Sequence, residues 1–241
     1  MAIFEEKCKI NVENIGISNL ITNKGILNIL ENSACRHSDI VGFGINDIPT
    51  THLSWILLAW KVKILKRVTY GTELTVKTWA KCANKFQTCR DFEVLDESGD
   101  IVCIATSKWT LINTEKGKIE RITDDIIERY NPEEINVFEN SEIEKITEPE
   151  TYSSEYIYTT QRRDIDVNHH MHNLNYLSLA YEALPIDVYN SSECNNIEIM
   201  YKKGIMLGAT VKCFYSHTDS SHFITIKSED ERVLHAIVKL Y

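Results

Sequence analysis

Apolar residues in the first half of the chain recur first at helix spacing and then at strand spacing. Residues 4–12 are typical of a short strand, and the apolar positions from Leu20 to Ala34 predict a helix. Two glycines and a proline interrupt residues 36–51, which we predict to be a loop. The runs after it are rich in β-forming residues and alternate between apolar and polar positions, as half-buried strands do. Strands are expected over 53–65, 74–79, 88–95 and 101–112.

The second half of the chain repeats this order of elements in a shorter form. A strand is predicted over 153–160, and leucine and tyrosine spacing predicts a helix over 173–184. Asn173 is the expected N-cap of this helix, and Pro185 marks its end. Further strands are expected over 197–201, 210–216, 222–227 and 233–240.

The two halves can be aligned outside the helices as well. Lys66 stands five residues before Gly71, which leads into an alternating strand. Lys203 stands at the same distance before Gly208, which also leads into one. Strands that pair without crossover helices imply an antiparallel sheet, and the long helix of each half must bury its apolar stripe against that sheet. The sequence therefore predicts an α+β fold of two tandem helix-on-sheet modules.

An acidic segment separates the two modules. Residues 124–150 contain ten acidic side chains against Arg129 and Lys145, with prolines at positions 132 and 149. A run of this composition is usually a solvated linker. The predicted organisation is an N-terminal module over 1–123, the linker over 124–150 and a C-terminal module over 151–241.

Composition and charge exclude several classes of function. The chain has 241 residues and a formal net charge of −9, which disfavours nucleic acid and anionic membranes as general partners. It has no apolar run of the roughly 18 to 20 residues that a membrane span needs, and its first residues lack the apolar region of a signal peptide. We therefore expect a cytoplasmic protein. An anionic partner would have to find local positive charge, and the candidates are Arg162, Arg163, Lys202 and Lys203.

The cysteines indicate neither a disulfide framework nor a zinc site. They are odd in number and well separated, and no C-x-x-C pair occurs. We interpret them as reduced and mostly buried. They stand at positions 8, 35, 82, 89, 103, 194 and 213.

Polar residues are concentrated just before the helix predicted over 173–184. If residues 164–170 are extended, alternation sends Asp164, Asp166, Asn168 and His170 to one face. The cluster then leads into a helix N-terminus, where free N–H groups and the positive end of the helix dipole favour an anion or a developing oxyanion.

Other interpretations of the same residues remain open. Asp and Asn side chains can simply cap a helix and shape a turn. The nearby histidines do not have the i, i+4 spacing of a helical metal pair with an acidic third ligand, so a metal site is disfavoured. A cysteine nucleophile is also disfavoured, because no cysteine lies in this stretch.

The stretch resembles a known family. Asp164-x-Asp166-x-x-x-His170-x-x-Asn173-x-x-Tyr176 is similar to the D-x-D-x-x-G-H-x-N-N-x-x-Y signature of hot-dog-fold thioesterases. Residues 166–170, Asp-Val-Asn-His-His, resemble the D-V-N-x-H core of the acyl-acyl-carrier-protein thioesterases of plants and bacteria. Shorter matches follow in the same order over nearly the whole chain, including Arg-Asp-Phe at 90–92 and Tyr-Lys-Lys at 201–203.

This resemblance implies two tandem hot-dog modules, each an antiparallel sheet wrapped around a long helix, with an acyl-chain pocket in the N-terminal one. It implies hydrolysis of fatty acyl-acyl-carrier-protein thioesters to free fatty acid, without metal or other cofactor. Asp166, Asn168 and His170 would be catalytic: Asp166 and His170 activate water, or Asp166 attacks directly, and Asn168 positions water or carbonyl. The partner would be acyl carrier protein bearing a fatty acyl-phosphopantetheine, and we allow for a homodimer.

The chain departs from the family pattern in two places. Gly204 and Ile205 stand where a glutamate and sometimes a cysteine follow the family's Y-R-R block, and His172-Asn173 replaces paired asparagines. Two alternatives to hydrolysis of carrier-protein thioesters therefore remain open. One is the same chemistry on acyl-coenzyme A, and the other is a non-catalytic acyl-binding hot-dog protein.

Overall fold

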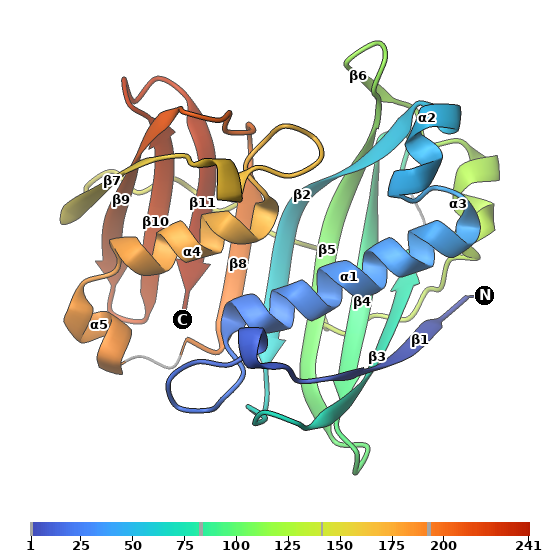
Figure 1. Cartoon of the computed structure of the whole chain (residues 1–241), viewed down its shortest axis with the longest axis horizontal. Coiled ribbons are helices and arrows are strands. Elements are labelled where there is room, and N and C mark those ends of the chain that lie inside the picture. The colour runs from blue at the N-terminus through green and yellow to red at the C-terminus, as the bar shows by residue number, and fades with distance from the viewer. Residues whose placement is uncertain (1, 82–83, 141, 192–193) are drawn as a thin grey trace. The chain divides into compact units, whose positions relative to one another are not determined.

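Two compact units make up the chain, residues 1–143 and residues 144–241. The structure is a computed structural model, and it describes residues 2–81, 84–140, 142–191 and 194–241. Each unit has one long helix on an antiparallel sheet (Figure 1), which confirms the predicted α+β class. The module bounds 1–123 and 151–241 stay a prediction.

The sheet of the first unit has the strand order β1-β3-β4-β5-β2, with β6 paired to β5. Every neighbouring pair in this order is antiparallel, as the alternating sequence predicted. The strands are β1 (Phe4–Lys9), β2 (Leu53–Ile64), β3 (Glu73–Ala80), β4 (Gln87–Leu95), β5 (Ile101–Asn113) and β6 (Lys118–Glu120).

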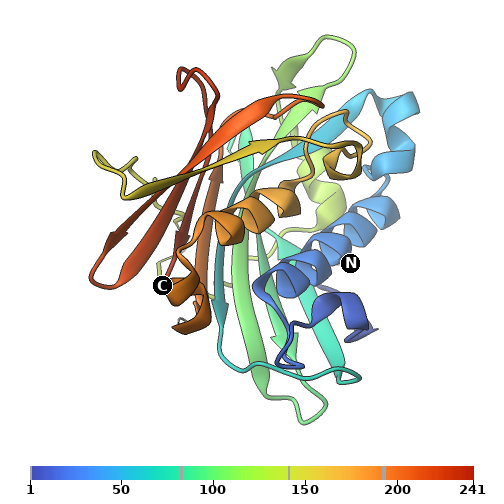
Figure 2. The same ribbon diagram turned by 60° about the vertical axis from the view of Figure 1, so that its left-hand side comes forward.

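Helix α1 (Asn23–Val41) lies across this sheet (Figure 2). It begins at Thr22, whose side chain accepts the backbone N–H of Gly25 at 2.9 Å. It ends at Gly42, whose φ of 81° lies in the left-handed region that residues with a side chain rarely adopt.

The helix is longer than the sequence predicted. The loop expected over 36–51 is wrong for its first part, because residues 36–41 contain no glycine or proline and the helix continues to Val41. Two short helices occupy most of the remainder, η2 (Ile45–Asp47) and α2 (Ile48–Thr51). Periodicity missed them because each is only about one turn long.

A buried arginine lies between α1 and the sheet. Arg90 is 6% exposed, and its Nη1 donates to Thr78 Oγ1 at 3.2 Å and lies 3.0 Å from Nδ1 of His37. Its guanidinium also lies 5.6 Å from the ring centre of Tyr130. Burial lowers the pKa of Arg90 to about 10, so the group is still a cation at neutral pH. Arg90 therefore places a buried positive charge between α1 and the sheet of the first unit.

The acidic segment 124–150 is not solvated along its whole length. It opens with helix α3 (Asp124–Tyr130), which buries Ile126 and Tyr130 in the first unit. The Tyr130 hydroxyl accepts a hydrogen bond from Trp55 Nε1 at 2.8 Å and donates one to Ser38 Oγ at 3.0 Å. Acidic composition hid this helix, because its two buried side chains are outnumbered by charged neighbours.

The sheet of the second unit has the strand order β8-β11-β10-β9-β7, and all of its pairs are antiparallel. Helix α4 (Asn173–Ala183) packs against β7, β9 and β11 (Figure 2). A short helix that the sequence did not predict, α5 (Ile186–Ser191), follows Pro185. The strands are β7 (Ser154–Thr159), β8 (Asn196–Tyr201), β9 (Thr210–Thr218), β10 (Ser221–Ser228) and β11 (Leu234–Leu240).

Ile146, from the end of the acidic segment, packs in this unit against Met200 and Ile237. No helix in the described ranges is long and apolar enough to cross a membrane. The six described cysteines are free thiols, and Cys82 lies outside the described residues.

Candidate active site

The polar stretch ahead of α4 forms a turn. The short 3-10 helix η3 (Arg162–Asp164) is followed by an antiparallel bridge between Ile165 and Met171. Inside it, the Asp166 N–H donates to the carbonyl of His170 at 2.9 Å, and the His169 N–H donates back to the carbonyl of Asp166 at 3.1 Å. His169 has a φ of 61°. The extended path predicted for 164–170 is therefore wrong, because the chain reverses within five residues.

The turn separates Asp164 from the other polar residues of the motif. Asp164 is buried, and its Oδ2 accepts the backbone N–H of Gln161 and the hydroxyl of Tyr158, both at 2.7 Å. These bonds close η3 and tie it to β7. Asp164 is a structural residue, and the prediction that it shares a face with Asp166 is wrong.

The side chains of Asp166 and His170 both interact with the backbone of Asn168. Asp166 Oδ1 accepts the backbone N–H of Asn168 at 2.8 Å, and His170 Nδ1 lies 2.8 Å from the Asn168 carbonyl oxygen. A carbonyl can only accept, so Nδ1 carries the proton and the neutral ring offers a lone pair at Nε2. Asn168 and His170 are exposed, and Asp166 is half-buried. The turn thus presents a carboxylate, a carboxamide and a basic ring nitrogen within five residues.

Gly204 lies directly beside the His170 ring. A Cβ placed on Gly204 would lie 3.0 Å from Cγ of that ring and closer still to its Cδ2. The glutamate expected here from the family resemblance would have to begin in the space that the imidazole occupies.

Tyr176 anchors the helix that follows the turn. It is buried, is hydrogen-bonded to the backbone of Ile205, and its ring meets that of Tyr201 edge-on at 5.3 Å. Burial, reinforced by the charge of Asp166, raises the pKa of Tyr176 to about 12. The Tyr201 hydroxyl donates to the carbonyl of Asn173 at 3.2 Å. The motif tyrosine therefore fixes the start of α4 and stays protonated at neutral pH.

The first unit contains the same turn, which the sequence patterns did not reveal. The 3-10 helix η1 (Val12–Asn14) precedes a bridge between Ile15 and Ile21, and Asn19 has a φ of 59°. Each of these features recurs 150 residues later. The signal in the sequence was the pair Asn-Ile at 14–15 and Asp-Ile at 164–165.

The two turns differ in the side chains that they present. Gly16, Ser18 and Leu20 stand at the positions of Asp166, Asn168 and His170. The Gly16 N–H still donates to the Leu20 carbonyl at 2.9 Å, and the Asn19 N–H to the Gly16 carbonyl at 3.0 Å. The backbone therefore forms without a carboxylate, carboxamide or imidazole, and capping or turn formation alone does not account for those three side chains in the second unit.

The basic residues of the predicted patch lie on either side of the turn in sequence. Arg162 and Arg163 belong to η3, and Lys202 and Lys203 follow β8; all four are exposed. Arg163 is hydrogen-bonded to Tyr158. Lys203 has no carboxylate within 4 Å among the residues that the structure describes, whereas Lys66, at its position in the first unit, is paired with Asp96 at 2.6 Å.

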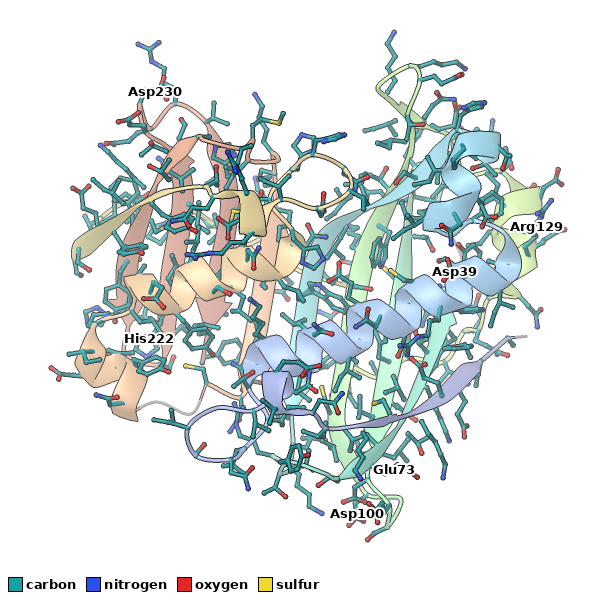
Figure 3. The ribbon with its side chains drawn as sticks, in the orientation of Figure 1. Asp39, Glu73, Asp100, Arg129, His222 and Asp230 are labelled. Atoms are coloured by element: carbon teal, nitrogen blue, oxygen red, sulfur yellow. The ribbon has the colours of Figure 1, made fainter. Side chains whose placement is uncertain are left out.

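Two histidines of the second unit, His217 and His222, lie away from this turn. His222, labelled in Figure 3, stands near the start of β10, and its cross-strand partner His217 is at the end of β9 opposite to the turn. Its Nδ1 is 3.0 Å from the Tyr215 hydroxyl, and burial lowers its pKa. Across the described ranges, no three His, Cys, Asp or Glu side chains are grouped so as to hold a metal ion.

Sequence models of one family match both units. The acyl-ACP thioesterase N-terminal domain matches residues 1–130, and the C-terminal domain of the same family matches residues 147–239. The chain belongs to the acyl-ACP thioesterase family. The turn with Asp166, Asn168 and His170 lies in the part matched by the C-terminal domain, and the turn without them lies in the part matched by the N-terminal domain.

The chain is similar to curated chloroplastic proteins of plants. The chain is 28% identical over 217 residues to oleoyl-acyl carrier protein thioesterase 2 of Arabidopsis thaliana, covering 83% of this chain and 59% of that protein. It is 23% identical to palmitoyl-acyl carrier protein thioesterase of Gossypium hirsutum, covering 91% of this chain and 56% of the relative. The chain thus spans less than two thirds of the length of these relatives.

Solved structures share the whole fold. An acyl-ACP thioesterase from Bacteroides thetaiotaomicron superposes with a TM-score of 0.86 at 21% identity, covering 99% of this chain and 96% of that one. The 12:0-ACP thioesterase from Umbellularia californica gives a TM-score of 0.87 at 20% identity with the same coverage. The predicted acyl-ACP thioesterase fold of two hot-dog modules is confirmed.

Proposed function

We propose that this chain hydrolyses the thioester of a fatty acyl-acyl carrier protein and releases the free fatty acid. The observation that carries this proposal is the turn at 165–171, which repeats the backbone of the first unit but adds Asp166, Asn168 and His170. Membership of the acyl-ACP thioesterase family supports the choice of substrate. The cysteine pattern supports a cytoplasmic location.

His170 is the general base for the attacking water. Its Nε2 accepts a proton from water as the oxygen attacks the thioester carbonyl carbon, and the Asn168 carbonyl stabilises the resulting imidazolium through Nδ1. The C–S bond then breaks, and Nε2 returns the proton to the leaving sulfur of the phosphopantetheine thiol. Water, thioester and enzyme thus give a carboxylic acid, a thiol and the unchanged imidazole.

Asp166 and Asn168 organise the reacting groups. One oxygen of Asp166 is used by the Asn168 N–H at 2.8 Å, and the other has no hydrogen-bond partner among the described residues, so it can orient the water. The carboxamide of Asn168 is exposed and can bind the water or the carbonyl. Backbone N–H groups at the start of α4 favour the oxyanion, because they lie at the positive end of the helix.

Removal of either reacting group is expected to abolish most hydrolysis. Asp166→Asn and His170→Ala should each lower kcat/KM by about 10²- to 10⁴-fold, the usual contribution of general acid–base catalysis. Release of carrier thiol from one purified acyl-ACP measures this. Ser18→Ala, at the position of Asn168 in the first unit, is the matched control and should hydrolyse at the wild-type rate.

Circular dichroism of these variants should match the wild type, since the turn forms without either group in the first unit. Near-wild-type turnover in both Asp166→Asn and His170→Ala would refute the site. EDTA should leave the rate unchanged; a loss of activity that zinc restores would refute water activation by side chains alone.

Positive charge beside the turn is expected to dock the carrier. Lys202→Glu together with Lys203→Glu should raise KM for acyl-ACP at low salt and leave kcat nearly unchanged, because the carrier is acidic. The effect should shrink as salt rises, since exposed charges are screened over about 10 Å at 0.1 M. Lys116→Glu with Lys118→Glu, in the β5–β6 hairpin, is the control of equal charge. Equal KM values for both double variants at low salt would remove Lys202 and Lys203 from the docking surface.

Chain-length preference is expected to depend on β2. Leu57 is 3% exposed and Trp60 is fully buried, and both belong to the apolar run 53–60 of β2. We expect this run to contribute to the acyl pocket of the first unit. Leu57→Ala and Leu57→Phe should shift the preferred acyl length in opposite directions, because each methylene accommodated or refused is worth only about 1 kcal/mol. The rate on the preferred substrate should change less than the preferred acyl length does.

Leu177→Ala, in α4 of the second unit, is the matched core truncation and should leave the length profile in place. Both truncations cost stability, so assays are run well below the unfolding temperature of each variant. A profile that Leu57 variants leave unchanged and Leu177→Ala shifts would place the pocket in the second unit.

A further inference from the structure

We propose that Gly204 is a positioning residue: it leaves the room in which the His170 ring keeps Nδ1 on the Asn168 carbonyl. The catalytic meaning of this arrangement rests on the proposed function, whereas the arrangement itself can be tested separately. It also assigns a role to one of the positions at which the chain departs from the family pattern.

The steric observation is direct. A Cβ on Gly204 would lie 3.0 Å from Cγ and 3.2 Å from Nε2 of His170, and closer still to Cδ2. Non-bonded carbon atoms at their best separation are about 3.5–4.0 Å apart. The His170 ring therefore cannot occupy its present position if residue 204 carries a side chain.

Backbone conformation does not account for this glycine. Its φ lies outside the left-handed region, whereas Gly208, four residues later, has a φ of 75°. Alanine is therefore compatible with the backbone at 204. The feature that matters at 204 is the empty space where a side chain would be.

The backbone around Gly204 is held on both sides. The Lys203 carbonyl accepts a hydrogen bond from His235 Nδ1 at 2.9 Å, and the Ile205 carbonyl accepts the Met171 N–H at 2.8 Å. A side chain added at 204 would therefore displace the exposed imidazole of His170 and leave the strand ends in place.

The first unit shows the alternative arrangement. Arg67 stands at the position of Gly204, and its guanidinium donates to the Ile21 carbonyl at 2.8 Å and to Asn23 Oδ1 at 2.7 Å. Leu20 stands there at the position of His170. Where this position carries a side chain, the side chain braces the start of the helix and no imidazole is present.

Gly204→Ala is expected to lower kcat by about 10- to 100-fold with little change in KM, because a base displaced by about 1 Å loses much of its effect. Gly204→Glu should be at least as inactive, although it introduces the residue that the family resemblance places there. The matched control is Gly16→Ala in the first unit. Its Cβ would meet only a methyl group of Thr22 at 3.3 Å, and it should retain wild-type activity.

A double-mutant cycle separates positioning from a general structural effect. In a His170→Ala background, Gly204→Ala should change the remaining rate by less than about twofold, because the ring that it displaces is gone. An equal loss in both backgrounds would show that Gly204 acts independently of His170 and would refute the proposal.

Nitrogen-15 NMR of the His170 ring tests the arrangement without any substrate. The wild type should show the tautomer with the proton on Nδ1, and Gly204→Ala should lose that preference while its thermal unfolding stays close to the wild type. If Gly204→Ala keeps the Nδ1–H tautomer, the proposal is wrong even where hydrolysis is lost. If the wild type shows this tautomer and Gly204→Ala loses it, but no acyl-ACP is hydrolysed by either, the arrangement stands and the proposed function fails.

Discussion

One backbone hydrogen bond fixes the turn in each unit, and the rest of the site depends on it. In the second unit the Met171 N–H donates to the Ile205 carbonyl at 2.8 Å, and in the first unit the Ile21 N–H donates to the Val68 carbonyl at the same distance. Each bond joins the residue two positions before the long helix to the segment that precedes the third strand of its sheet. It places the turn, the helix start and the end of a strand side by side.

The same backbone carries different chemistry in the two units. In the first unit the place beside the turn is taken by Arg67, which braces the helix start, and the turn itself presents Gly16, Ser18 and Leu20. In the second unit Gly204 leaves that place to His170. Exposed imidazole and carboxamide groups are not needed to form this turn, because the first unit forms it without them. Such exposed polar groups point to binding or catalysis more strongly than buried ones do.

The sequence predicted the strands well and the ends of the helices less well. The start of β2 at Leu53 was predicted from a run rich in large apolar residues, and alternation over residues 60–64 indicated its half-buried end. It could not show that α1 continues to Val41 or that Tyr130 is buried, because polar side chains occupy most of both segments. Burial of those residues depends on contacts with distant strands.

The motif identified the candidate site because Asp166, Asn168 and His170 are close in sequence. The separation of Asp164 from the other motif residues could not be predicted, since it depends on the 3-10 turn and on the hydrogen bond from Tyr158. Contact between His170 and Gly204 joins segments 34 residues apart, and only the fold brings them together.

The most direct test gives the second turn the side chains of the first. A variant with Asp166→Gly, Asn168→Ser and His170→Leu should fold like the wild type by circular dichroism and thermal unfolding, because the first unit builds this turn from those residues. Free fatty acid released from acyl-ACP should fall to the level without enzyme. Release within a few-fold of the wild type by the folded variant would show that the chemistry lies elsewhere in the chain.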